Sequence, residues 1–355
     1  MSTFNWHGHF SHFFSGTPNG WNPDPFDLIR ISPLCYFSSG TLPSNLCAML
    51  KFGFFRRWGG IVALTVAVSL SSGAEVSGVK HMVIIGCDGM SPDGIRKAQA
   101  PVMKRMMNEG AWTLHARGVM PTSSSPNWAS MIMGAGPEQH GVTSNDWETN
   151  KFEIEPLVRG TGAMFPTIFG ELRQQRPAAV IGCFHDWNGF GRLFERDAAN
   201  KIEDSDGPTN AVRHAIEYLR EEKPTFLFIH LDHVDHAGHH DGHGTPAYYA
   251  SVDVADKLIG QVLEELGKSD LAKDTVVLIT ADHGGVGTKH GGATMAELEI
   301  PWILYGPGVK RGHELKTAVN TYDTAVTAAY VLGIRPHPSW IGKPIAEAFS
   351  ERAAQ

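Results

Sequence analysis

Residues 81–88 read HMVIIGCD, a short apolar run that ends in a carboxylate. A continuous apolar run of this length is typical of a strand that is buried on both faces of a parallel sheet. In open α/β sheets, ligands bind outside the carboxyl ends of the strands. The stretch therefore predicts a central strand of an α/β sheet, with Asp88 at the edge where a ligand would bind.

Similar apolar runs recur along the chain and alternate with segments of helical period. The further runs cover 178–183, 225–230, 275–280 and 302–305, and the helical segments lie near 98–110, 209–222, 247–267 and 322–332. Strands that alternate with helices of this length indicate βαβ units. We therefore expect an α/β fold with a mostly parallel central sheet, flanked by helices on both faces, and a single catalytic domain over 75–355. Residues 141–177 show neither period, and we expect a small irregular cap within 141–220.

The segment 49–74 has the features of a secretory signal peptide. Basic residues from Lys51 to Arg57 precede the apolar run 61–70, and small residues lead to Ala74. The run is shorter than the roughly 20 apolar residues that span a bilayer. We expect cleavage after Ala74, no stable membrane span afterwards and a periplasmic or secreted location; an uncleaved anchor is the alternative. Residues 1–48 lie upstream of another Met and are expected to be unstructured or mis-annotated.

The composition limits the partners of the chain. Its 37 acidic residues outnumber its 30 basic residues, giving a net charge of −7. This balance argues against nucleic acid or an anionic membrane surface as a partner. Within 75–355 the cysteines are Cys87 and Cys183, and each ends an apolar run. We expect buried thiols, not a disulfide framework or a thiolate metal site.

Acidic and histidine residues follow three of the expected strands. Asp88 follows the first, Asp235 the strand at 225–231, and Asp282-His283 the strand at 275–280. Taken alone, each could be a turn, a helix cap or a surface histidine tract. Together they fall at the same end of their strands, so they predict ligands for divalent cations at one edge of the sheet.

A hydroxyl run supplies a candidate nucleophile. Residues 121–127 read PTSSSPN, and Pro126 at a first helical position with Ser125 as N-cap is an ordinary helix start. A serine at a helix N-terminus lies in positive potential, which stabilises an alkoxide and a phosphoryl group. Ser124 together with the metal ligands therefore points to metal-assisted phosphoryl or sulfuryl transfer.

These residues fall in motifs that resemble a known family. The motifs are CDG at 87–89, PTSSSPN at 121–127, GAGPEQHG at 134–141, DHAGH at 235–239 and DHG at 282–284. They resemble the alkaline phosphatase superfamily and, within it, the type I phosphodiesterase/nucleotide pyrophosphatase branch, over residues 80–347. The resemblance implies an alkaline-phosphatase-like fold and a hydrolase of phosphate diesters or pyrophosphates.

The resemblance also implies the roles of individual residues. Ser124 would be the nucleophile and form a phosphoseryl intermediate, and Asn127 would hydrogen-bond a phosphoryl oxygen. Two divalent metal ions are implied, expected to be Zn²⁺ with Mn²⁺ or Mg²⁺ as alternatives. Their ligands would be Asp88, Ser124, Asp282 and His283 for one ion, and Asp235, His239 and His290 for the other.

The chain departs from the pattern of this branch at several positions. The usual threonine nucleophile is replaced by Ser124, and the aromatic residue that follows it by Ser125. A second stacking aromatic falls on His230, so nucleotide specificity stays open, with Trp128, Trp147 or Trp187 as substitutes. Asn145 and Trp147 are expected to bind substrate. His290 follows His283 unusually closely, and Asp232 with His236 offers the same spacing as Asp235 with His239.

Alternative functions use the same residues. No Arg neighbours Ser124 in sequence to balance the extra charge of a monoester, which favours a diester or pyrophosphate as the small-molecule substrate. A phosphomonoesterase or phosphonate hydrolase is the main alternative, and a non-catalytic metal- or phosphate-binding periplasmic protein is another. A sulfatase is disfavoured because the Cys/Ser-x-Pro-x-Arg motif is missing at the nucleophile.

Overall fold

The structure of the chain is a computed structural model that describes residues 76–350. The extension expected at 1–48 and the signal peptide expected at 49–74 lie outside the described residues. Among the helices within 76–350, none has the length and apolarity needed to cross a membrane.

The described residues form an eight-stranded sheet with the order β4-β3-β5-β1-β6-β7-β2-β8. β7 runs antiparallel to both of its neighbours, β6 and β2, and the other pairings are parallel. The mostly parallel sheet predicted from the apolar runs is therefore confirmed. The strands are β1 (His81–Cys87), β2 (Ala111–Arg117), β3 (Ile181–His185), β4 (Lys201–Asp204), β5 (Phe226–Leu231), β6 (Thr275–Thr280), β7 (Glu299–Tyr305) and β8 (His313–Glu314).

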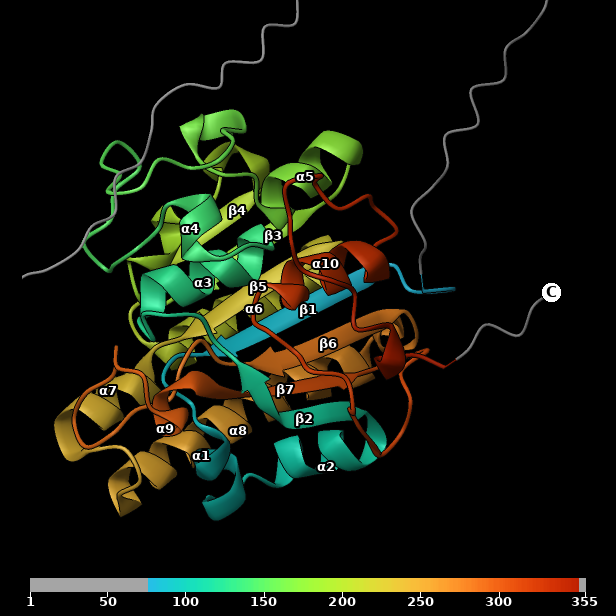
Figure 1. Cartoon of the computed structure of the whole chain (residues 1–355). Coiled ribbons are helices and arrows are strands. Elements are labelled where there is room, and N and C mark those ends of the chain that lie inside the picture. The colour runs from blue at the N-terminus through green and yellow to red at the C-terminus, as the bar shows by residue number, and fades with distance from the viewer. Residues whose placement is uncertain (1–75, 351–355) are drawn as a thin grey trace, which may run out of the picture. The chain divides into compact units, whose positions relative to one another are not determined.

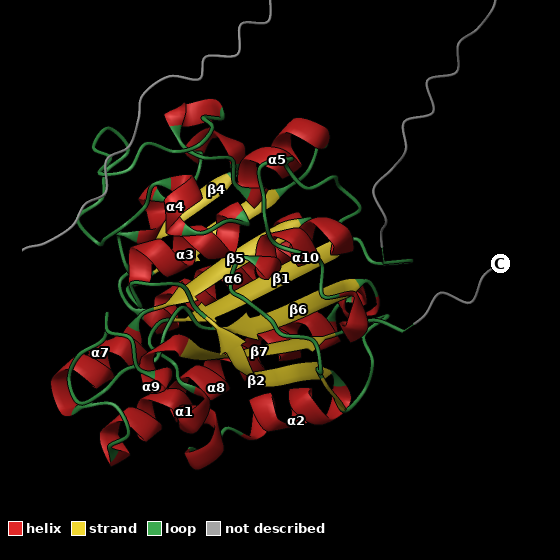
Figure 2. Cartoon of the chain, viewed as in Figure 1, coloured by secondary structure: helices red, strands yellow, loops and turns green. Residues whose placement is uncertain are grey.

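Helices cover both faces of this sheet, as expected (Figures 1 and 2). One face carries α3 (Ser124–Met133), α4 (Pro137–His140), α5 (Ile168–Gln175) and α10 (Asp323–Val331). The other carries α1 (Pro92–Lys97), α2 (Pro101–Glu109), α6 (Pro208–Glu222), α7 (His233–Asp241) and α8 (Pro246–Lys268). The short α9 (Met295–Leu298) precedes β7, and single 3₁₀ turns are η1 (Thr161–Ala163), η2 (Phe190–Arg192), η3 (Arg196–Ala198), η4 (Asp270–Lys273) and η5 (Ala346–Ala348).

The packing of α3 on β1 connects the core to the predicted site. Gly86 leaves room for the Trp128 ring, because a Cβ on Gly86 would lie 2.5 Å from two of its atoms. Trp128 is fully buried, and its indole Nε1 donates a hydrogen bond to Asp88 Oδ2 at 2.9 Å. The first helical residue of α3 is Ser124. The helix that carries the candidate nucleophile is thus fixed against the strand that ends at Asp88.

Several local predictions need correction. α3 begins at Ser124 with Ser123 as N-cap, so Ser125 is not the N-cap. Pro126 is tolerated at the third helical position because the first four backbone N–H groups of a helix have no intrahelical acceptor. β3 begins at Ile181, later than the apolar run 178–183 suggested. The predicted buried thiols are confirmed, since Cys87 and Cys183 are free and buried.

Candidate metal and nucleophile site

Three neighbouring strands bring the predicted acidic residues together. β1 lies between β5 and β6, and the β1–β6 pairing ends with Gly86 opposite Thr280, two residues before Asp88 and Asp282 respectively. Asp235 follows β5 in the first turn of α7. A Cβ on Gly89, whose φ is +67°, would lie 2.8 Å from Asp235, so this approach requires glycine. The carboxyl ends of three strands therefore meet where the sequence predicted a site.

The first cluster contains Asp88, Asp282 and His283, all fully buried. His283 Nε2 lies 3.4 Å from Asp88 Oδ1 and 3.2 Å from Asp282 Oδ2. Ser124 Oγ lies 3.3 Å from the same His283 Nε2. The four residues implied as ligands of one metal ion are thus side by side.

The second cluster contains Asp235, His239 and His290. His239 Nε2 lies 3.2 Å from Asp235 Oδ2 and 3.1 Å from His290 Nε2, and His290 Nε2 lies 3.9 Å from Asp235 Oδ1. The rings of His283 and His290 stack with centroids 3.8 Å apart, which joins the two clusters. All residues implied for the second ion therefore converge as well.

The geometry of helix α7 distinguishes between two possible ligand pairs, Asp235 with His239 and Asp232 with His236. Residues four apart lie on one helical face, and Asp235 and His239 use that spacing to face the site. His236 lies on the exposed side, where its ring stacks with that of His240. Asp232 instead donates its backbone N–H to Asp186. The geometry favours the pair Asp235 and His239 over Asp232 and His236.

The three histidines of the site are oriented by backbone carbonyl groups. Nδ1 of His239 lies 3.0 Å from Thr288 O, Nδ1 of His290 lies 2.9 Å from Thr122 O, and Nδ1 of His283 lies 2.8 Å from Gly284 O. A carbonyl oxygen only accepts, so each Nδ1 carries a proton toward it. Rings oriented in this way direct Nε2 toward the site, which is the arrangement of histidine metal ligands.

The carboxylates also fit a cationic ligand. Within the described part of the chain, Asp88 Oδ1, Asp235 Oδ1 and Asp282 Oδ2 are buried without hydrogen-bond partners. Burial and the charge of Asp88 raise the pKa of Asp235 to about 6 and raise the pKa of Asp282 above its usual range. Buried carboxylates of this kind need a counter-charge. Carboxylate oxygens and imidazole Nε2 atoms form a donor set that suits a divalent metal such as zinc.

His230 forms a buried contact with the carboxylate of Asp88. Its Nε2 lies 3.3 Å from Asp88 Oδ2, and its Nδ1 lies 3.5 Å from Asp186 Oδ1. Burial opposes the charged ring, but the nearby carboxylates of Asp186 and Asp88 raise the pKa of His230 to about 10. His230 is therefore a buried imidazolium packed against Trp128, with ring centroids 4.8 Å apart. At the position where the resemblance places a second stacking aromatic, this chain therefore has a buried ring without an exposed face.

Asn127 does not have the partners expected of a phosphoryl-binding residue. Its Nδ2 donates to the carbonyl oxygens of Pro121 and Ser123 at 3.0 and 2.9 Å, and its Oδ1 accepts from Val119 N at 2.6 Å. Both ends of the Asn127 amide are thus hydrogen-bonded to the loop before α3, and these bonds fix the shape of that loop.

Asn145 lies at the N-terminus of α3. Its Oδ1 accepts from Ser125 N at 2.8 Å, which leaves its Nδ2 available as a donor near Ser124. Trp147, expected beside it, is buried and packs edge-on against Phe152 with centroids 5.5 Å apart. Trp147 is therefore a core residue of the irregular segment and not a surface for substrate.

Sequence reasoning missed two charged residues next to the nucleophile. Arg192, from η2, lies 3.3 Å from Ser125 Oγ and also donates to Asn145 O. Glu148 forms an ion pair with it, with 3.1 Å between Arg192 Nη1 and Glu148 Oε1. The contacts join segments far apart in the chain, and no motif in the sequence marks either residue.

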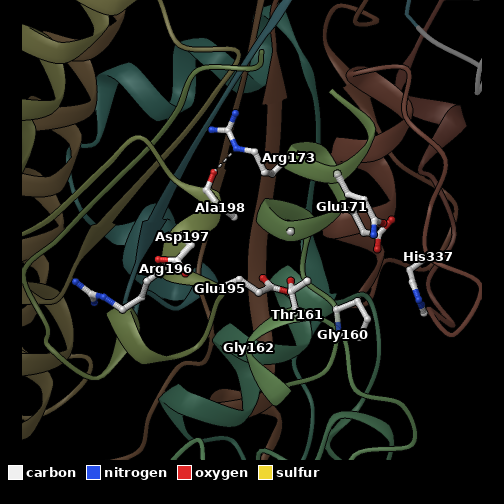
Figure 3. A pocket seen from close by; sticks show the side chains of 13 residues that line it. Gly160, Thr161, Gly162, Glu171, Arg173, Glu195, Arg196, Asp197, Ala198 and His337 are labelled. Carbon is white, nitrogen blue, oxygen red and sulfur yellow. Dashed lines mark hydrogen bonds between the residues drawn. The ribbon is translucent and has the colours of Figure 1, made fainter. Parts of the chain in front are cut away.

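A cavity of about 520 Å³ lies elsewhere, between α5 and η3. Figure 3 shows its lining, including Glu195 and Arg173, whose Nε donates to Ala198 O at 2.9 Å. The Glu195 carboxylate is already hydrogen-bonded by Thr167. The lining contains none of the predicted site residues, so this cavity is separate from the site.

Comparison with known proteins agrees with the fold. The mostly parallel sheet with helices on both faces is an alkaline-phosphatase-like fold. A structure of murine ectonucleotide pyrophosphatase/phosphodiesterase 5 in complex with AMP has the same fold, with a TM-score of 0.65 and 16% identity over 76% of this chain and 100% of that one. A mutant of the alkaline phosphatase PafA also has a TM-score of 0.65, with 12% identity over 77% of this chain and 99% of that one.

Residues 82–299 match the model of the type I phosphodiesterase/nucleotide pyrophosphatase family, and the chain belongs to this family. The mouse ectonucleotide pyrophosphatase/phosphodiesterase family member 3 is 22% identical over 219 residues, which cover 57% of this chain and 24% of that protein. The chain thus spans about a quarter of the length of this curated relative. Such relatives are hydrolases.

Proposed function

We propose that the chain is a metal-dependent hydrolase of phosphate diesters or pyrophosphates that acts through a phosphoseryl intermediate on Ser124. The observation that carries the proposal is the position of Ser124 Oγ, 3.3 Å from His283 Nε2, in a cluster where Asp88 and Asp282 each keep one buried oxygen without a hydrogen-bond partner among the described residues. Membership of the family supports the same substrate class.

One metal ion would be held by Asp88, Ser124, Asp282 and His283, and the other by Asp235, His239 and His290. The histidine nitrogens favour zinc, and the oxygen ligands also suit Mn²⁺ or Mg²⁺. When bound, such ions lower the pKa of a hydroxyl group and neutralise charge on phosphoryl oxygens.

The chain itself positions the reacting groups. Ser124 lies at the first position of α3, where the helix dipole and backbone N–H groups favour negative charge. Asn145 Nδ2 donates to a non-bridging phosphoryl oxygen beside it. The Ser124 oxygen attacks phosphorus, and the bond from phosphorus to the leaving oxygen breaks. Water then attacks the phosphoseryl group and releases the Ser124 oxygen, which regains a proton.

An alternative reaction and a cellular location are also proposed. A phosphomonoesterase or phosphonate hydrolase would use the same nucleophile and ligands, but the family match supports the diester and pyrophosphate class more directly. A periplasmic or secreted location rests on the sequence of 49–74 alone.

The test compares two chromogenic substrates with the metal-loaded full chain. Bis-p-nitrophenyl phosphate and p-nitrophenyl phosphate are hydrolysed side by side, with Ser124→Ala as the nucleophile variant and Ser269→Ala, at the end of α8, as the matched serine control. We expect turnover of the diester that Ser124→Ala abolishes and Ser269→Ala retains. Absence of Ser124-dependent turnover on both substrates, with metal shown to be bound, would refute the proposal.

A further inference from the structure

Arg192 places a cationic group against Ser125, the residue that follows the candidate nucleophile. Its Nη2 donates to Ser125 Oγ and to Asn145 O, and its Nη1 pairs with Glu148. The side chain is only 24% exposed, and within the described residues its buried Nε has no hydrogen-bond partner. The guanidinium is thus partly desolvated and fixed in position.

The surroundings of Arg192 favour recognition of charge over recognition of an aromatic ring. The residue after the nucleophile is Ser125, whose hydroxyl is hydrogen-bonded to Arg192. Of the aromatic candidates, His230, Trp128 and Trp147 are buried, whereas Trp187 is partly exposed, with its ring centroid 6.0 Å from that of His230. Asn145 and Arg192 therefore bring an amide and a positive charge to Ser125, the residue that follows Ser124. Guanidinium groups bind phosphate oxygens through paired hydrogen bonds, which makes arginine suited to this task.

We propose that Arg192 is a specificity-determining residue that recognises a second negative charge close to the transferred phosphoryl group. The charge is carried by the phosphoryl group itself, as in a monoester, or by a phosphate bonded to it, as in a pyrophosphate. This inference rests on the proposed function. A diester of two alcohols has one negative charge and gains less from Arg192.

Glu148 competes with the substrate for Arg192. Its side chain is 54% exposed, and its ion pair with Arg192 must be exchanged when an anion binds. Water screens the exposed Glu148 end of the pair, so exchanging it for a substrate anion costs less than breaking a fully buried ion pair. Removing the Glu148 charge should therefore strengthen the recognition of a second negative charge, opposite to the effect of removing Arg192.

The experiment compares three substrates with the metal-loaded full chain at pH 8. Bis-p-nitrophenyl phosphate has one charge. p-Nitrophenyl phosphate has two on one phosphorus, because the second pKa of a phosphate ester is about 6, and P1,P2-diphenyl pyrophosphate has two on neighbouring phosphorus atoms. The variants are Arg192→Gln and Glu148→Gln, with Arg213→Gln as a matched control from an exposed ion pair with Glu217 on α6.

We expect Arg192→Gln to lower kcat/KM about 10- to 100-fold for at least one doubly charged substrate, as the loss of a charged hydrogen bond implies. The diester should change less than about threefold, Glu148→Gln should raise kcat/KM for the same substrate, and Arg213→Gln should change nothing. A loss on the monoester alone or on the pyrophosphate alone identifies the source of the charge. Equal losses on all three substrates, or no loss, would overturn the inference.

A binding measurement separates this inference from the proposed function. Calorimetric titration of inorganic phosphate and pyrophosphate into the metal-loaded chain requires no turnover. If wild type lacks Ser124-dependent activity, the proposed function fails, but weaker binding to Arg192→Gln than to Arg213→Gln still supports the anion subsite. Equal binding to these two variants, with circular dichroism showing both folded, refutes the subsite.

Discussion

Replacing Gly86 by alanine tests the link between the core and the site. The added Cβ would lie 2.5 Å from two atoms of the Trp128 ring, whereas ordinary contacts are 3.4–4 Å. Trp128 must therefore move by about 1 Å or more, and it carries α3 and the hydrogen bond to Asp88 with it. Overpacking of this kind costs about 1–3 kcal/mol. We expect Gly86→Ala to lower both the free energy of unfolding and Ser124-dependent turnover.

The assays are urea unfolding and hydrolysis of bis-p-nitrophenyl phosphate by the metal-loaded chain. Gly267→Ala is the matched control, because a Cβ there meets no heavy atom within 4 Å in α8, where alanine is also the better helix former. The double variant Gly86→Ala/Trp128→Phe should recover stability, since the smaller ring leaves space, but not the hydrogen bond to Asp88. An unchanged unfolding midpoint and unchanged turnover in Gly86→Ala would show that this packing argument is wrong.

Three further predictions concern single residues. His239→Ala should reduce bound metal, measured by atomic absorption, and His236→Ala should not; the reverse result would support the slipped pairing. Burial lowers the pKa of His140 to about 3, so the unfolded chain binds more protons between about pH 6.5 and 3 and stability falls as the pH falls through that window. His140→Gln should flatten this slope in urea titrations, and an unchanged slope would contradict the assignment. Asn127→Ala, which removes the hydrogen bonds to the loop before α3, should lower the free energy of unfolding by about 1–3 kcal/mol; a drop below about 0.5 kcal/mol would refute this structural role.

The predictability of each strand depended on its burial. β1, β5 and β6 are almost wholly buried, so their residues form continuous apolar runs that the sequence reveals. β4 is an edge strand that reads KIED, and its exposed polar residues give no such run. β8 has only two residues. The strand order, which places β1 between β5 and β6, depends on tertiary packing and could not be predicted from the sequence. The rule that ligands bind at the carboxyl ends of strands nevertheless predicted that Asp88, Asp235 and Asp282 would lie close together.

Those site residues could be predicted that lie close together in one segment and whose side chains are common metal ligands. Asp235 and His239 share a helical face, and Asp282 and His283 are adjacent. The partners of Asn127 could not be read in this way, because the amide folds back onto carbonyl groups of its own loop. Arg192 could not be found at all, since its approach to Ser125 depends on how the irregular segments pack.

The charges inside the site explain why metal binding and stability should be linked. The buried carboxylates of Asp88, Asp235 and Asp282 face one another, and the imidazolium of His230 balances only part of this charge because it is shared with Asp186. Uncompensated buried charge is costly, and a ligand that binds only the folded chain stabilises it by its binding free energy. The same unpartnered oxygens that suit a divalent cation therefore make the folded state depend on it, whereas a surface histidine tract would bind metal without this effect on unfolding.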